Sequence, residues 1–75
     1  MNSKLKAGES VVDYYAHITR EAARTEISDE DLLIIFISGL PAAMRQYTAL
    51  QNPDSLDHAF RLAKAFEQVR LLDSQ

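Results

Sequence analysis

The chain has 75 residues, which is enough for one compact domain with a single core and too few for two. Hydrophobic residues make up 47% of it and charged residues 25%, the balance of a folded domain rather than of a disordered segment. Eight lysines and arginines against eleven aspartates and glutamates give a formal net charge of -3, which disfavours direct binding to a phosphate backbone. We therefore expect one folded domain without a direct nucleic-acid partner.

The sequence contains no cysteine, which excludes disulfide bonds, cysteine-ligated zinc and iron–sulfur clusters. Its longest uninterrupted apolar run, from Leu32 to Ile37, is six residues long. A membrane-spanning helix needs about 20 apolar residues, so no membrane partner is expected.

Residues 1–9 are mostly polar and are predicted to form a short extended arm, with Leu5 as the side chain that docks it on the fold; residues 10–75 then form the domain. Ser10 followed by Asp13 is typical of a helix start, because the hydroxyl can accept from an unpaired backbone amide there. A helix is therefore predicted at about 11–25. Its apolar positions recur at spacings of three and four and share one face: Val11, Tyr14, Tyr15, Ile18 and Ala22.

The second predicted helix covers about 29–38. Ser28 and Asp31 repeat the start signal, and Gly39 is expected to end the helix in a left-handed conformation. Pro41 suits the first turn of a third helix at about 42–50, because its missing amide would be unpaired there anyway.

A turn at Asn52 and Pro53 precedes a fourth helix at about 56–72, with Asp54 or Ser55 as its cap. No strand pattern competes with these four segments. The sequence thus predicts an all-α fold of four helices.

The second helix has one unusual property, which is that apolar residues surround it over most of two turns. At roughly 100° per residue, one group is predicted to face the core: Leu33, Phe36, Ile37 and Leu40. Ile34 and Ile35 are then predicted to point outward, with Asp31 and Ser38 at their edge. A domain with only two layers hardly buries a helix all round, so these four residues are the candidate interface.

The alternative is that the third or fourth helix covers the two isoleucines, which would make this the central helix of the bundle. If instead two copies met across a two-fold axis, four isoleucines would be buried, a gross gain of about 6–12 kcal/mol. Association costs about 4–15 kcal/mol, so the expected homodimer is weak by itself and becomes useful when many copies are linked in an array.

Other chemistry finds little support in the sequence. His17 and His58 have no second histidine or cysteine at metal-ligand spacing, so no metal and no cofactor is expected. The acidic run Asp29–Asp31 lacks a calcium-loop pattern and is better explained as first-turn acids at a helix start. No serine has the context of a nucleophile and no glycine-rich phosphate loop occurs, so no enzyme activity is expected.

An ordered series of short motifs resembles the capsid region of gypsy-type retrotransposon Gag proteins. The series consists of Lys6, Ala7, Gly8, Glu9, Ser10, Val11, Val12, Asp13 and Tyr14, then Ile27 to Asp31, Phe36, Gly39, Leu40 and Pro41, and finally Asn52, Pro53, Ser55, Leu56, Ala59, Ala63 and Glu67. Each motif is weakly specific alone. Their order is more distinctive and covers nearly the whole chain.

The resemblance implies a capsid C-terminal domain, a compact four-helix fold that forms homodimers mainly through its second helix and joins Gag copies into a shell. Ile34 and Ile35 fall where that family places its dimer contacts. The resemblance also implies that Gly8 and the start of the first helix correspond to the major homology region, with Val11, Tyr14 and Ile18 keeping its spacing. The partners it implies are further copies and the remaining Gag domains, in cytoplasmic virus-like particles.

The chain departs from the retroviral pattern in several places. Ala7 stands where retroviruses have glutamine, His17 stands where they have arginine, and the stretch after Gly8 is shorter by about two residues. The polar network of the retroviral motif is therefore not carried over to this chain. The Gag zinc knuckle has no counterpart here, so RNA packaging would belong to other Gag segments.

Two alternatives from other classes remain at this point. One is a SCAN-type dimerisation domain of a transcription factor, whose helices resemble those of retroviral capsid domains. The other is an adaptor domain whose groove binds a peptide of another protein, as domesticated Gag descendants can do.

Overall fold

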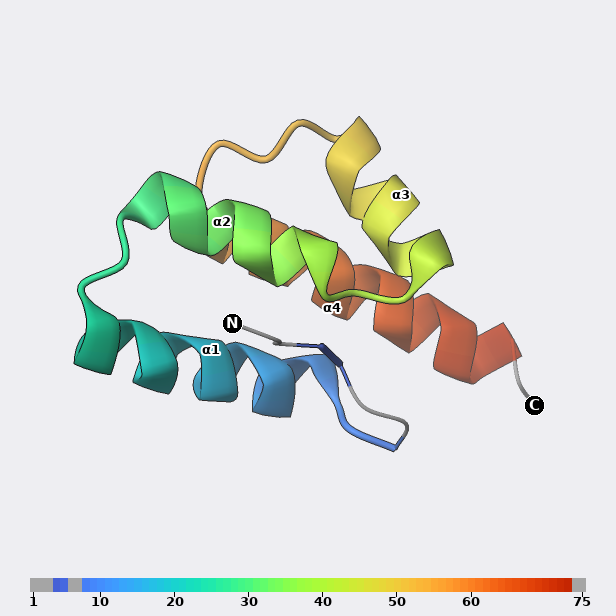
Figure 1. Ribbon diagram of the computed structural model, residues 1–75. Helices are drawn as coiled ribbons and strands as arrows, with labels where there is room; N and C mark the ends of the chain where they lie inside the picture. Colours follow the sequence, from blue (N-terminus) through green and yellow to red (C-terminus); the bar gives the residue numbers. More distant parts are fainter. Residues whose placement is uncertain (1–3, 6–7, 74–75) are drawn as a thin grey trace.

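The fold consists of four helices packed in two layers, as seen in a computed structural model (Figure 1) that describes residues 4–5 and 8–73, with side chains up to Val69. The helices are α1 (Val11–Thr25), α2 (Asp29–Ser38), α3 (Ala42–Leu50) and α4 (Leu56–Asp73). No strand occurs in the described residues. The all-α prediction is confirmed, and the predicted helix ends agree with the observed ones to within one residue.

Serine side chains begin three of the four helices. The Oγ atoms of Ser10 and Ser28 each accept from the backbone N–H of the residue three positions later, at 3.2 Å. Ser55, rather than Asp54, does the same for α4, where its Oγ accepts from the His58 N–H at 3.1 Å. Each serine thus pairs one of the amides that a helix start leaves without a partner.

The predicted left-handed conformation of Gly39 is wrong. Gly39 has φ -87° and ψ -2°, so α2 ends in a right-handed turn. Its N–H donates to the Ile35 carbonyl at 3.2 Å, and the next amide, of Leu40, donates to the Ile37 carbonyl at 3.1 Å. Because these bonds already close the last turn of α2, the chain reaches Pro41 without a left-handed residue. Left-handed residues follow α1 and α3 instead, at Glu26 with φ 52° and at Asn52 with φ 49°.

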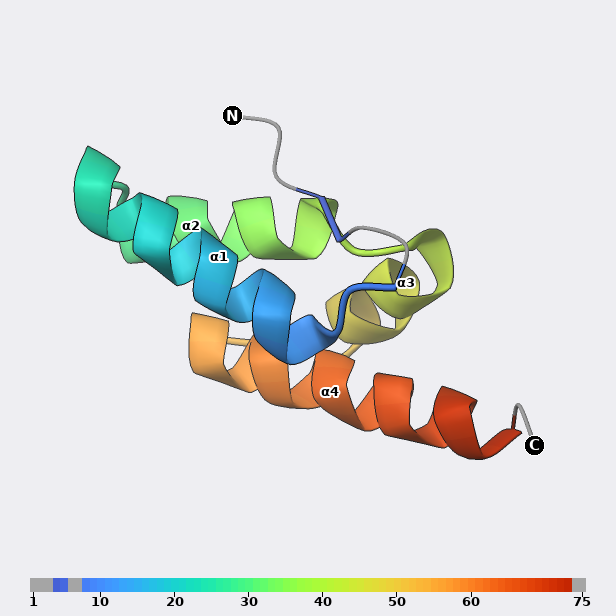
Figure 2. The same cartoon turned by 90° about the horizontal axis from the view of Figure 1, so that it is seen from below.

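α1 and α3 each pack against both α2 and α4. Figures 1 and 2 show α1 on one side of the α2–α4 pair and α3 on the other. The buried residues come from all four helices and from the α2–α3 link: Val11, Tyr14, Ile18, Leu32, Phe36, Leu40, Met44, Thr48, Ala59 and Ala63. Ala59 and Ala63 of α4 are the smallest of these side chains, and they allow the neighbouring helices to approach α4 closely.

The N-terminal arm is tied to the end of α2. The Leu5 N–H donates to the Gly39 carbonyl at 2.9 Å, and the Leu5 side chain packs against the core. Gly8 then turns the chain toward α1. Its φ of +83° is a backbone conformation that residues with a Cβ rarely adopt. Residues 4–5 therefore lie beside the end of α2, and residues 8–10 lead into α1 (Figure 1).

Candidate functional site

The inner face of α2 is a stripe of residues four apart that continues past the end of the helix. Leu32, Phe36 and Leu40 are buried, and Phe36 has no exposed surface. The Phe36 ring stacks on Tyr14 with centroids 5.2 Å apart and meets Tyr15 edge-on at 6.1 Å. These aromatic contacts from α1 determine which side of α2 faces the core.

The Tyr14 hydroxyl adds a polar attachment between α1 and α2. It donates to the Phe36 carbonyl at 2.9 Å and lies 3.3 Å from the Ile35 carbonyl. Burial, and secondarily the negative charge of Glu9, raises the pKa of Tyr14 to about 12. The neutral hydroxyl therefore persists over the physiological pH range and holds the rotation of α2 about its own axis.

The outer face of α2 is centred on Ile34, which is 62% exposed. Ile34 is two residues before Phe36, so it points roughly 160° away from the centre of the buried stripe. Ile35 and Ile37 lie on the two flanks of α2 and are half-buried against the core. The outer face thus presents one exposed isoleucine between two partly covered ones.

The prediction that Ile35 points fully outward is wrong, because the core stripe of α2 runs through Leu32, Phe36 and Leu40 rather than through Leu33 and Ile37. That rotation brings Ile35 onto the flank and leaves Leu33 half-buried. The alternative, in which the third or fourth helix covers both isoleucines, holds only in part. α2 packs against all three other helices and Ile35 is half-buried, but Ile34 remains 62% exposed.

Two polar residues border Ile34 on the outer face. Asp31 and Ser38 are both exposed, and the Ser38 hydroxyl donates to the Ile34 carbonyl at 2.7 Å. Of the four residues in the predicted interface, the structure thus brings Asp31, Ile34 and Ser38 together and places Ile35 beside them. Among the predicted core residues, Val11, Tyr14, Ile18, Phe36 and Leu40 are buried, whereas Gly8 is exposed.

Glu67 contributes a contact that the sequence reasoning missed. Its Oε2 accepts from the Val11 N–H at 2.9 Å, so a carboxylate from α4 pairs an amide at the start of α1. The electrostatics are favourable, because a negative charge stabilises the positive end of a helix. The sequence predicts that the start of α1 has an unpaired backbone amide. No local spacing in the sequence indicates which distant residue accepts from that amide.

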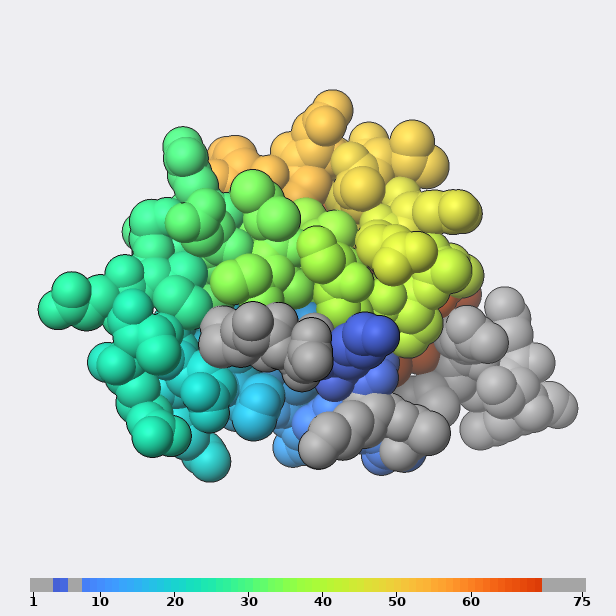
Figure 3. Space-filling view, in the orientation of Figure 1, coloured from blue at the N-terminus to red at the C-terminus, as the bar shows by residue number. Residues whose placement is uncertain are grey.

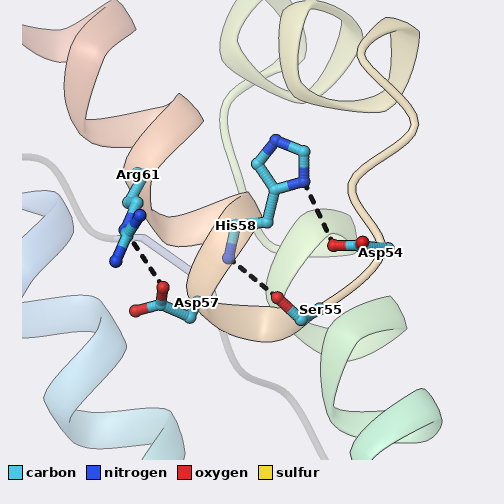
Figure 4. Close-up of polar contacts among 5 residues, drawn as sticks. All are labelled: Asp54, Ser55, Asp57, His58 and Arg61. Atoms are coloured by element: carbon cyan, nitrogen blue, oxygen red, sulfur yellow. Dashed lines mark hydrogen bonds and ion pairs between the residues drawn. The ribbon is translucent and has the colours of Figure 1, made fainter.

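The start of α4 holds the densest group of polar contacts (Figure 4). His58 Nδ1 lies 3.3 Å from Asp54 Oδ1, and Arg61 Nε lies 3.0 Å from Asp57 Oδ2. The Asp54, Asp57 and Arg61 side chains are largely exposed and both of these contacts join residues four apart, as on any helix surface. The group therefore explains the stability of a helix start and indicates no reaction.

A shallow hollow of about 340 Å³ lies between the starts of α2 and α4. Its walls are Asp29, Glu30, Leu33, Asp54, Ser55 and Leu56. The three acids lie within or next to the first turns of the two helices, where negative charge offsets the helix dipole. Within the described residues, no three histidine, cysteine or acidic side chains are grouped so that they could hold a metal ion, and His17 is exposed on α1.

No protein-family description, no curated protein and no solved structure matches this chain. In the part of the chain that the structure describes, no helix is both long and apolar enough to cross a membrane.

Proposed function

We propose that this chain is a protein-interaction domain of the Gag capsid C-terminal type, which associates with further copies of itself through the outer face of α2. The observation that carries the proposal is the exposure of Ile34 at the centre of a helix that packs against all three others. An apolar residue at that place has no role in the core. Its association with the same residue of a second copy would remove both from water.

The order of motifs in the sequence supports the same proposal. The second helix is the element through which the Gag family dimerises, and Ile34 with its rim residues Asp31 and Ser38 lies on that helix. In this setting the domain contributes neither catalysis nor direct nucleic-acid contacts. It holds Gag copies together in cytoplasmic virus-like particles, beside the other Gag segments.

The size of the outer face determines how strong a single contact is. Burying two Ile34 side chains and the flanks of their neighbours contributes roughly 3–6 kcal/mol. Association costs about 4–15 kcal/mol, so an isolated pair dissociates at ordinary concentrations. Weak two-fold contacts suit a shell, because each copy is held near its neighbours by other contacts and can correct its position during assembly.

Analytical ultracentrifugation of the 75-residue chain up to millimolar concentration tests the proposal. The wild-type chain is expected to show a reversible monomer–dimer equilibrium. Ile34→Asp is expected to abolish it, because the dimer would bury two unpaired carboxylates, while the helical circular dichroism stays unchanged at so exposed a position.

Leu50→Asp is the matched control, since Leu50 is 79% exposed and lies at the end of α3 rather than on α2. It introduces the same charge and removes a comparable apolar side chain, and it is expected to leave association intact. A wild-type chain that stays monomeric at millimolar concentration would overturn the proposal, as would equal effects of the two variants. A dimer that Ile34→Asp leaves intact would also overturn it, because its contact surface would lie elsewhere.

A further inference from the structure

The first turn of α2 carries three acids, Asp29, Glu30 and Asp31, and the last turn carries no basic residue. None of the three carboxylates forms an ion pair with another described residue. Of the three, Asp31 borders Ile34 on the outer face, on the flank of α2 that also carries Ile35 four residues later. The contact face proposed above therefore has a negative charge at one end only.

The N-terminal arm places a positive charge at the other end of the same face. Leu5 donates its N–H to the Gly39 carbonyl, so the preceding residue, Lys4, lies next to the end of α2. Lys4 is exposed and, like Asp31, has no ion-pair partner within the described part of the chain. Figures 1 and 3 show residues 4–5, in dark blue, beside the end of α2 on the side of α1.

Lys4 and Asp31 form no ion pair with each other within one copy. Asp31 and Gly39 are eight positions apart, which is about 12 Å along a helix axis. Each copy thus carries a lysine near one end of α2 and an aspartate near the other, and the two charges are not paired with each other.

The positions of Lys4 and Asp31 along α2 match when two copies associate through Ile34 with their α2 helices antiparallel. Residues at equal distances before and after Ile34 then face each other across the two-fold axis. Asp31 is about 4.5 Å from the axis on one side, and Gly39, beside Lys4, is about 7.5 Å from it on the other. The two-fold axis that makes the helices antiparallel leaves the α1-facing flanks of both α2 helices on the same side of the dimer. Lys4 of one copy and Asp31 of the other therefore lie within reach of each other.

A parallel arrangement would have the opposite effect, because the first-turn acids of both copies would lie side by side. Chains that each have a net charge of -3 already repel one another. Resting on the proposed self-association, we infer that a second copy docks with its α2 antiparallel, held in this register by two ion pairs between Lys4 and the Asp31 carboxylate of the opposite copy. The isoleucines supply the attraction, and the charges select the orientation.

Charge reversal on the complete chain tests the inference. Lys4→Glu alone places a carboxylate against the Asp31 carboxylate at both ends of the contact, and Asp31→Lys alone places lysine against lysine. Each variant is therefore expected to associate about five- to tenfold more weakly than wild type in low salt. When the two variants are mixed, both ends of the mixed dimer hold opposite charges, and association is expected to return to the wild-type strength.

Lys64→Glu is the matched control, because it makes the same change of net charge at an exposed position of α4. It is expected to have little effect on association. Circular dichroism checks that Asp31→Lys still folds, and Lys4→Glu, which lies outside every helix, tests the same ion pair without touching α2. Added salt is expected to reduce the difference between Lys4→Glu and wild type.

The outcomes separate this inference from the proposed function. A wild-type dimer that Ile34→Asp abolishes, but that Lys4→Glu and Lys64→Glu weaken equally, would overturn the inference and leave the proposed function in place. The same holds if the mixture of Lys4→Glu and Asp31→Lys associates no better than either variant alone. A strictly monomeric wild-type chain would overturn both.

Discussion

α1 and α2 begin in the same way and are used differently. Each starts with a serine whose hydroxyl accepts from an amide three residues later, and each presents a buried stripe to the core. On the side of α1 away from the core, Asp13, His17 and Arg20 are exposed and Val12 is 45% exposed, whereas α2 exposes Ile34, at 62%, near its centre. The serine signal thus determines where a helix begins, but it does not determine which side chains of that helix remain exposed.

The largest expected difference in unfolding free energy is between substitutions on the two opposite faces of α2. Phe36→Ala removes a fully buried ring that contacts Tyr14 and Tyr15, and it is expected to cost about 3–5 kcal/mol of unfolding free energy. Ile34→Ala, two residues away, is expected to change that free energy by less than about 0.5 kcal/mol. Urea denaturation of dilute, monomeric samples followed by circular dichroism measures both. Similar losses for the two variants would show that α2 has no free face.

The next effect concerns the attachment of α1 to α2. Tyr14→Phe removes the hydrogen bond to the Phe36 carbonyl and is expected to lower the unfolding free energy by about 1–2 kcal/mol. In the folded chain the pKa of Tyr14 is about 12 against 10.0 for an ordinary tyrosine, so folding favours the neutral phenol. The resulting contribution of Tyr14 to the unfolding free energy is complete below about pH 10 and is lost as the pH rises toward about 12.

The pH dependence gives this prediction its control. Unfolding free energies measured at about pH 8 and about pH 11 are expected to fall further for wild type than for Tyr14→Phe, because only wild type has the phenol whose ionisation is suppressed by folding. All other residues are the same in the two proteins, so their contributions cancel in the difference. Equal losses in the two proteins would contradict the role assigned to the Tyr14 hydroxyl.

The smallest effect concerns the start of α1, which is held by a distant residue as well as by its own serine. Glu67→Ala leaves the Val11 amide without its acceptor and is expected to cost about 1 kcal/mol of unfolding free energy. Gln68→Ala, at an exposed neighbouring position on α4, is the control and is expected to have no measurable effect. Thermal or urea unfolding measures the difference, and a loss with Gln68→Ala as large as that with Glu67→Ala would point to a general weakening of α4.

Local signals in the sequence were sufficient for the helices. Ser10, Ser28 and Pro41 mark the starts of α1, α2 and α3, because capping and the missing proline amide are properties of a residue and its nearest neighbours. The position of the α2 end was predicted, but the backbone conformation of Gly39 that follows it was not. Gly39 permits a left-handed conformation, but two local hydrogen bonds close the turn without it.

The candidate site was only partly predictable. With apolar residues all around α2, periodicity alone does not determine which side is buried. A rotation of roughly 50°, about half a residue, separates the predicted orientation from the observed one. The contacts that decide it come from Tyr14 and Tyr15 on another helix. Ile34 nevertheless stays outward under either rotation, which is why it was identified correctly while Ile35 was misplaced.

The contact between Val11 and Glu67 also affects how the chain completes its fold during synthesis. The two residues are 56 positions apart, so the first turn of α1 leaves the ribosome well before the carboxylate that pairs with it. Until α4 has emerged, the Val11 amide can bond only to water, and the emerging chain lacks most of its tertiary support. An N-terminal fragment that stops before residue 67 is therefore an incomplete fold rather than a smaller version of the domain.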